Sequence, residues 1–115
     1  MTAALQALLD RVEAGEASWN RLASIAEDAM PPKEAALAAT ANRGSLDAAK
    51  ALHEAVLPGC AWFIESAYRG DAPTAAIEGH GISVDASNDN PARAWLIAIL
   101  RALIAASVAE NEGGV

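Results

Sequence analysis

The chain has 115 residues, the size of one ordinary domain, and carries a net charge of −7. Hydrophobic residues make up 53% of it, but 30 residues are Ala and only 24 are Leu, Ile, Val or Phe, so the pattern of large side chains must show whether there is a core. Eight scattered basic residues against fifteen acidic ones argue against binding nucleic acid or an anionic membrane surface, because both require clustered Lys and Arg.

Cysteine content and apolar run length bear on the cellular compartment. A single Cys cannot form an internal disulfide, and the N-terminal residues show no basic segment followed by a long apolar one. The longest apolar run, Ala94 to Ala106, has 13 residues and contains Arg101, whereas a membrane span needs about 20. We therefore expect a soluble, cytoplasmic protein that does not span a membrane.

Three helices are predicted in the first part of the chain, at 3–14, 17–30 and 33–42. The first has one apolar stripe with helical spacing, formed by Leu5, Leu8, Leu9 and Val12. Ser18 is a candidate N-cap of the second helix, which two consecutive prolines end. The third is rich in Ala and has one large apolar residue, Leu37. We expect it to be short and weakly anchored, because Ala buries little area.

Two stronger helices are predicted at 46–57 and 91–109. Ser45 is a candidate N-cap of the first, and Pro58-Gly59 ends it. Asn90-Pro91 has the residue types that open a helix. The helix that follows is apolar around well over half of its circumference. Such a helix must be buried on more than one side.

Between these two helices the apolar period changes from 3.6 to 2, which predicts strands at 60–68, 74–78 and 82–86. The turn candidates are Arg69-Gly70-Asp71 and Gly79-His80-Gly81. The expected fold is α+β: a three-stranded antiparallel sheet packed with helices 46–57 and 91–109, plus the N-terminal helices. We treat 1–115 as a single domain, in which a helical part (1–44) packs on a helix–three strands–helix unit (45–110).

Few residues in this chain could carry chemistry. His53, Cys60 and His80 are the only soft metal ligands, and their spacing fits no recurring zinc pattern. Cys60 follows a predicted helix C-terminus, where the negative end of the helix dipole disfavours a thiolate. The sequence contains no glycine-rich phosphate loop, nucleophile elbow or zinc-protease motif. We expect no catalytic residue, cofactor or metal; the alternative is a ligand- or metal-binding regulatory module at His80 and Cys60, with His53.

The last predicted helix has more apolar surface than one sheet can cover. Trp95, Ile99 and Leu103 are therefore candidates for an interaction surface. The N-terminal helices could cover this surplus within one chain, or a second copy or another protein could cover it. The sequence leaves both possibilities open.

Three stretches resemble a known family: Ser45–Leu52, then Val56–Trp62 with its Leu-Pro-Gly, and Asn90–Leu96 with the helix that follows. Over about 45–105 the chain resembles small phage- and prophage-associated proteins grouped as the phage ABA-sandwich domain. Cys60 and Ala61 stand where that family commonly has Trp, and Asn90-Pro91 replaces a Thr-Pro opening.

The resemblance implies an α–β–α layering and no activity, so no site residue comes from it. Together with the absence of catalytic motifs, it leads us to expect a small non-enzymatic interaction or structural protein. Such a protein would be encoded by a phage or prophage, and it would be cytoplasmic or, as a phage structural protein, associated with the virion.

Overall fold

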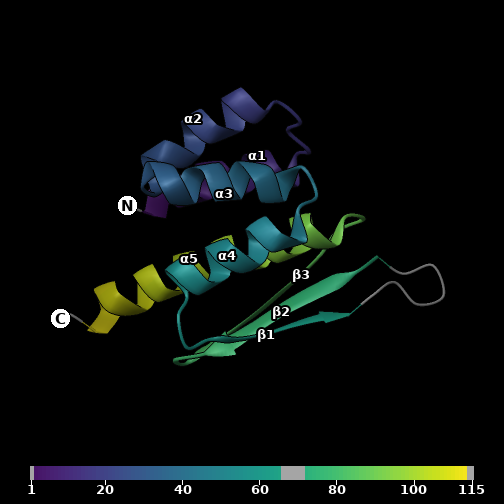
Figure 1. The fold of residues 1–115 in the computed structure, drawn as a ribbon. Helices are drawn as coiled ribbons and strands as arrows, with labels where there is room; N and C mark the ends of the chain where they lie inside the picture. Colours follow the sequence, from purple (N-terminus) through teal and green to yellow (C-terminus); the bar gives the residue numbers. More distant parts are fainter. Residues whose placement is uncertain (1, 66–71, 114–115) are drawn as a thin grey trace.

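The computed structural model describes residues 2–65 and 72–113 and has an α+β fold (Figure 1). Its helices lie in two layers on one side of a sheet. The outer layer holds three N-terminal helices, and the middle layer holds the other two. In chain order the elements are α1 (Thr2–Glu13), α2 (Trp19–Ala29), α3 (Pro32–Asn42), α4 (Leu46–Val56), β1 (Ala61–Glu65), β2 (Thr74–Gly79), β3 (Ile82–Ser87) and α5 (Pro91–Gly113).

Hydrogen bonds confirm the predicted helix caps at Ser18, Ser45 and Asn90, although the second helix starts at Trp19 rather than at 17. Ser18 Oγ accepts from the amide of Arg21 at 3.3 Å, and Ser45 Oγ accepts from the amide of Ala48 at 3.1 Å. Asn90 Oδ1 accepts from the amides of Ala92 and Arg93 at 2.9 and 3.3 Å. Each cap satisfies backbone donors that have no partner inside the helix. At the other end, α5 continues to Gly113, beyond the predicted end at 109.

The three strands form an antiparallel meander in the order β1-β2-β3, as predicted. A two-residue turn, His80-Gly81, joins β2 to β3. Of the strand predicted at 60–68, the structure shows Ala61–Glu65; positions 66–68 and the predicted turn at 69–71 lie outside the described residues. Opposed residues in such a sheet share a face, so Trp62, Ile77 and Val84 lie together on one face and Phe63, Ala76 and Asp85 on the other.

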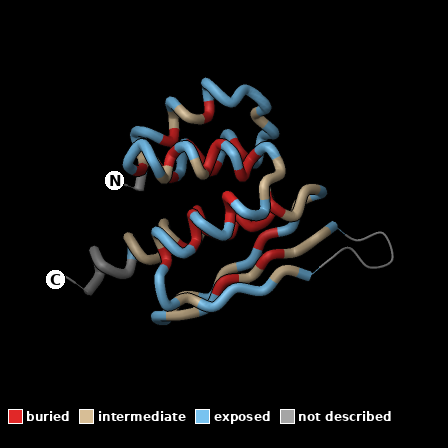
Figure 2. The backbone as a smooth tube through the Cα atoms, viewed as in Figure 1, coloured by how far each residue is buried: buried red, intermediate tan, exposed pale blue. Residues whose placement is uncertain are grey.

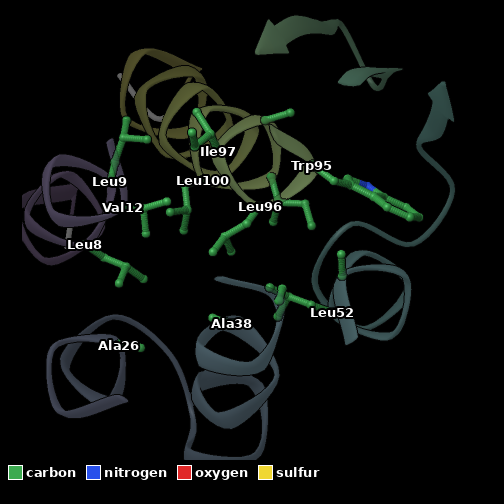
Figure 3. Close-up of a cluster of buried hydrophobic side chains, with 14 of the residues drawn as sticks. Leu8, Leu9, Val12, Ala26, Ala38, Leu52, Trp95, Leu96, Ile97 and Leu100 are labelled. Atoms are coloured by element: carbon green, nitrogen blue, oxygen red, sulfur yellow. The ribbon is translucent and has the colours of Figure 1, made fainter. Parts of the chain in front are cut away.

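The predicted central position of the last helix is confirmed. α5 packs against α1, α3, α4, β2 and β3, and Leu96, Ile99 and Leu100 are fully buried. Figure 3 shows Leu96 and Leu100 of α5 on the side that faces Leu8 and Val12 of α1. By length and composition Pro91–Val108 could cross a membrane, but 50% of it is buried inside the chain, as expected for the core helix of a folded domain.

The expectation that α3 is weakly anchored is wrong. Its buried residues are Ala35, Ala38, Ala39, Ala41 and Asn42, and the helix lies between α2 and α4 while also contacting α5. Small side chains let neighbouring backbones approach closely, so dispersion contacts replace the area that larger residues would bury. At the end of α3, Arg93 of α5 donates to the carbonyl of Asn42 from Nε and Nη2, at 3.2 and 2.9 Å.

The layering differs from that implied by the family resemblance. The helices of the described chain all lie on the Trp62 and Ile77 face of the sheet, so the layers run helix, helix, sheet (Figure 1). Within the described residues no helix covers the opposite face, and Figure 2 shows the strands at the outside of the molecule. The sheet is therefore one outer layer of the protein rather than its middle.

Candidate functional site at the aromatic edge of the sheet

Two tryptophans from distant parts of the chain stack where β1 meets α5. The ring centroids of Trp62 and Trp95 are 4.4 Å apart, and the planes are inclined by 34°. Trp95 is 3% exposed, whereas Trp62 is 39% exposed. The outer ring is thus supported from below by a buried one, which holds it in place while one side remains open to solvent.

His53 of α4 completes this cluster from the inside. Its ring lies 5.9 Å from that of Trp95 and is 2% exposed. Nε2 donates to the carbonyl of Cys60 at 3.0 Å, and Nδ1 accepts from Trp95 Nε1 at 3.3 Å. The tautomer with hydrogen on Nε2 satisfies both contacts. Because both nitrogens already have partners, His53 positions the aromatic cluster and has no free nitrogen for a metal or substrate.

Cys60 and His80 lie near each other at one end of the sheet, where the segment before β1 meets the β2–β3 turn. A Cβ on Gly79 would come within 2.9 Å of Cys60 Cα, so the two backbones are in close contact. His80 is exposed, and its Nε2 approaches the carbonyl of Pro58 at 3.4 Å. The structure therefore brings the three predicted soft ligands into one region, but in the described residues no three of His, Cys, Asp and Glu form a group able to hold a metal.

His80 has an unusual backbone conformation. Its φ is +52°, and that of Gly81 is +80°, so both central residues of the hairpin turn are left-handed. This is the type I′ geometry that suits the twist of a hairpin, and the turn predicted from Gly79-His80-Gly81 is confirmed. A non-glycine residue seldom adopts this region, although His does so more readily than most. The conformation is explained by the turn itself.

The candidate interaction residues on α5 are mostly inside the molecule, which corrects the surface proposed for them. Trp95 is 3% exposed and Ile99 is fully buried, so neither can contact a partner in this structure; Leu103 is half-buried. The N-terminal helices and α4 cover much of the surplus apolar surface within the chain. Near its end α5 remains partly open, since Ile104 to Ser107 are half-buried and Val108 is exposed.

Among the described residues the large exposed aromatics are Trp19 at the start of α2, and Trp62 and Phe63 side by side on β1. The sequence reasoning did not select the β1 pair as a site. Trp62 is 39% exposed and Phe63 is 55% exposed, on opposite faces of the strand. The available signal was their adjacency: one strand cannot bury two successive side chains against the same core. We call Ala61–Glu65, with these two aromatics, the β1 edge.

The two edges of the sheet differ in how they are covered. At the β3 edge, Arg101 of α5 donates from Nη1 to the carbonyl of Asp85 at 2.7 Å and also pairs with Glu13 of α1 at 3.2 Å. No described side chain hydrogen-bonds to the backbone of Ala61–Glu65. The β1 segment also contains no Lys or Pro, residues that commonly protect exposed edges. The β1 edge is thus the open one.

Shallow grooves elsewhere offer little for chemistry. One of about 510 Å³ lies between the β2–β3 turn and the end of α5, and His80 and Ser83 are its only polar side chains. Another of about 360 Å³ lies between the ends of α1, α2, α4 and α5 and is lined mainly by apolar side chains, with Ser107. Neither brings an acid and a base together among the residues that line it.

The stretches that carried the family resemblance have structural roles. Ser45 caps α4, the Leu57-Pro58-Gly59 turn ends it with Gly59 at φ +86°, and Asn90 caps α5. These roles account for the residues without any ligand. Comparison of the chain with models of protein families, with curated proteins and with solved structures finds no match.

Proposed function

We propose that this chain is a non-enzymatic interaction protein that binds an extended polypeptide along the β1 edge. The observation that carries the proposal is the exposure of Trp62 and Phe63, at 39% and 55%, on the uncovered edge of the sheet. Edge strands pair with extended chains through main-chain hydrogen bonds, and side chains on alternate faces then add specificity. Aromatic residues held rigidly at a surface are frequent anchors of protein interfaces.

The arrangement around Trp62 supports a binding role. Burying a large apolar side chain contributes about 1.5–3 kcal/mol, so both β1 aromatics would gain from a strand placed beside them. Trp95, which His53 positions, holds the Trp62 ring in place before binding, which reduces the conformational entropy lost on association. Phe63 lies on the outer face beside Ala76, a small residue that leaves the ring accessible.

A chemical role receives less support from the geometry. Both nitrogens of His53 are engaged within the fold, and Cys60 is a half-buried residue packed against the core. The family resemblance over 45–105 implies no activity. It supports the further proposal that the protein is encoded by a phage or prophage and acts in the cytoplasm or in the virion. Capsid or tail genes beside the coding gene would support that proposal.

The proposal is tested by selecting binders from a display library of random extended peptides against the immobilised full chain. Counter-selection uses Phe63→Lys, which places a charge on the β1 edge and removes an aromatic anchor. We expect selected peptides to shift the backbone amide resonances of Ala61–Glu65 and to bind the Lys variant at least about tenfold more weakly.

The matched control is Ser83→Lys. This exposed position lies on the same outer face but on β3, and the substitution adds the same charge to the chain. Its affinity for the selected peptides should remain close to that of the unmodified chain. Resonance shifts centred on another element, or equal loss of binding in the two Lys variants, would exclude the β1 edge as the recognition surface.

A further inference from the structure

We infer that the β1 edge pairs with the β1 edge of a second copy of this chain, forming a continuous antiparallel sheet of six strands about a two-fold axis. This inference rests on the proposed function and names the occupant of the same edge. It starts from the sequence of β1, Ala-Trp-Phe-Ile-Glu, and from the face on which each residue lies.

The sequence of β1 is self-complementary in one antiparallel register. With Phe63 opposite Phe63 of the copy, Trp62 faces Ile64 and Ala61 faces Glu65. Each pair then combines residues from the same face of the sheet, because opposed residues in antiparallel strands point the same way. Aromatic–aromatic and aromatic–β-branched pairs are favourable across strands, and no like charges are opposed. The two-fold axis passes through the Phe63 pair, which makes the contact isologous.

The same geometry explains why assembly would stop at two copies. Pairing consumes the β1 edge of both chains and leaves only β3 edges at the ends of the sheet. At the β3 edge the backbone carbonyl of Asp85 already accepts a hydrogen bond from Arg101, whose guanidinium also forms an ion pair with Glu13 of α1. An edge with a charged side chain bound to its backbone is a poor template for a further strand. A closed dimer is therefore expected, without fibres.

Size and charge indicate that the dimer is weak. Five described residues on each side are far fewer than the roughly 20–30 per partner of a standard interface. Each copy also carries a net charge of −7, and Glu65 would lie about two strand spacings, roughly 10 Å, from Glu78 of the copy. Salt screens repulsion at that distance. Association should therefore strengthen, not weaken, as ionic strength rises.

Sedimentation equilibrium of the full chain tests the inference, over about 10 µM to 1 mM protein and at low and high NaCl. We expect a reversible shift from 11.8 kDa towards twice that mass, favoured by salt. Phe63→Lys should weaken dimer formation at least about tenfold, since it opposes two ammonium groups at the axis. Ser83→Lys, with the same change in net charge, should leave the dimer intact.

The register is tested by cysteine cross-linking in a Cys60→Ser background. Phe63→Cys places two thiols opposite each other, within the Cα separation that a disulfide accepts, and should give a covalent dimer with oxidised glutathione. Glu65→Cys is the control, because position 65 faces position 61 of the copy and not itself. Equal cross-linking of the two variants overturns the register.

The outcomes separate this inference from the proposed function. A molar mass that stays at that of the monomer at every concentration, or that rises above that of two copies, overturns the two-fold dimer. The chain could still bind selected peptides through Ala61–Glu65, and the proposed function would then stand with another polypeptide as partner. Absence of both dimer and peptide binding would overturn both.

Discussion

At the scale of single residues, His53 shows how a chemically versatile side chain can serve packing alone. Its two ring nitrogens join three segments: α4, which carries the ring, the start of the sheet through Cys60, and α5 through Trp95. A buried polar group is tolerated only when its hydrogen bonds are made, and within the described residues every buried side-chain nitrogen and oxygen has a partner. The ring therefore sets the position of Trp95 beneath Trp62.

Replacing His53 by Ala should lower the free energy of unfolding by about 3 kcal/mol, because it leaves a cavity and removes the partners of Cys60 and Trp95. His53→Gln, which keeps a donor and an acceptor, should cost less. Urea denaturation followed by tryptophan fluorescence measures both changes. Glu54→Ala, at the exposed neighbouring position, is the control and should change stability by less than about 0.5 kcal/mol. If His53→Ala lowered the free energy of unfolding no more than the control does, His53 would make no stabilising contribution to the core.

At the scale of elements, α3 shows that a helix without large side chains can lie at the centre of a helical layer. Ala35, Ala38 and Ala39 are fully buried. We predicted that α3 is weakly anchored because each Ala buries little area. In the structure its packing depends instead on how closely α2 and α4 approach it. Close-packed interiors respond to added volume as well as to lost volume.

This packing can be tested by enlarging one side chain. Ala38→Leu should destabilise the chain by about 2 kcal/mol, since the added methyl groups must push neighbouring helices apart. Ala36→Leu makes the same change at an exposed position of the same helix and should be close to neutral. Thermal unfolding followed by circular dichroism compares the two. Equal melting temperatures for the two variants would show that α3 packs loosely.

At the scale of the whole molecule, α5 organises the fold because it contacts helices on one side and the sheet on the other. Figure 2 shows buried residues on helices of both layers and on the sheet. Seven successive residues, Ala94 to Leu100, are buried. Unfolding of this segment would therefore expose both interfaces at once.

Native-state hydrogen exchange should show the amides of Leu96 to Leu100 exchanging only through global unfolding, with the largest protection in the chain. Amides of α2, which packs on α1 and α3 at the outside, should exchange through smaller openings. NMR exchange rates across a range of low denaturant concentrations distinguish the two. Protection at Leu100 no greater than at Leu22 would contradict the central role of α5.

Local sequence was sufficient to predict the elements, because their signals depend on near neighbours. The stripe from Leu5 to Val12, the caps at Ser45 and Asn90, and the alternation in Ile82–Ala86 are each read within a few residues. The burial of the last helix on several sides could likewise be inferred from its apolar circumference. These features together specify an α+β fold with a three-stranded meander.

Only the tertiary structure decided what covers each apolar surface. The sequence left open whether Trp95 and Ile99 meet the N-terminal helices or another chain, and packing within this chain buries both. It likewise could not show that Trp62 and Phe63 remain exposed on an uncovered edge, or that His53 bonds to Trp95, 42 positions away. The reason is physical: periodicity shows that a face is apolar, but which segment packs on that face depends on contacts between residues far apart in the chain.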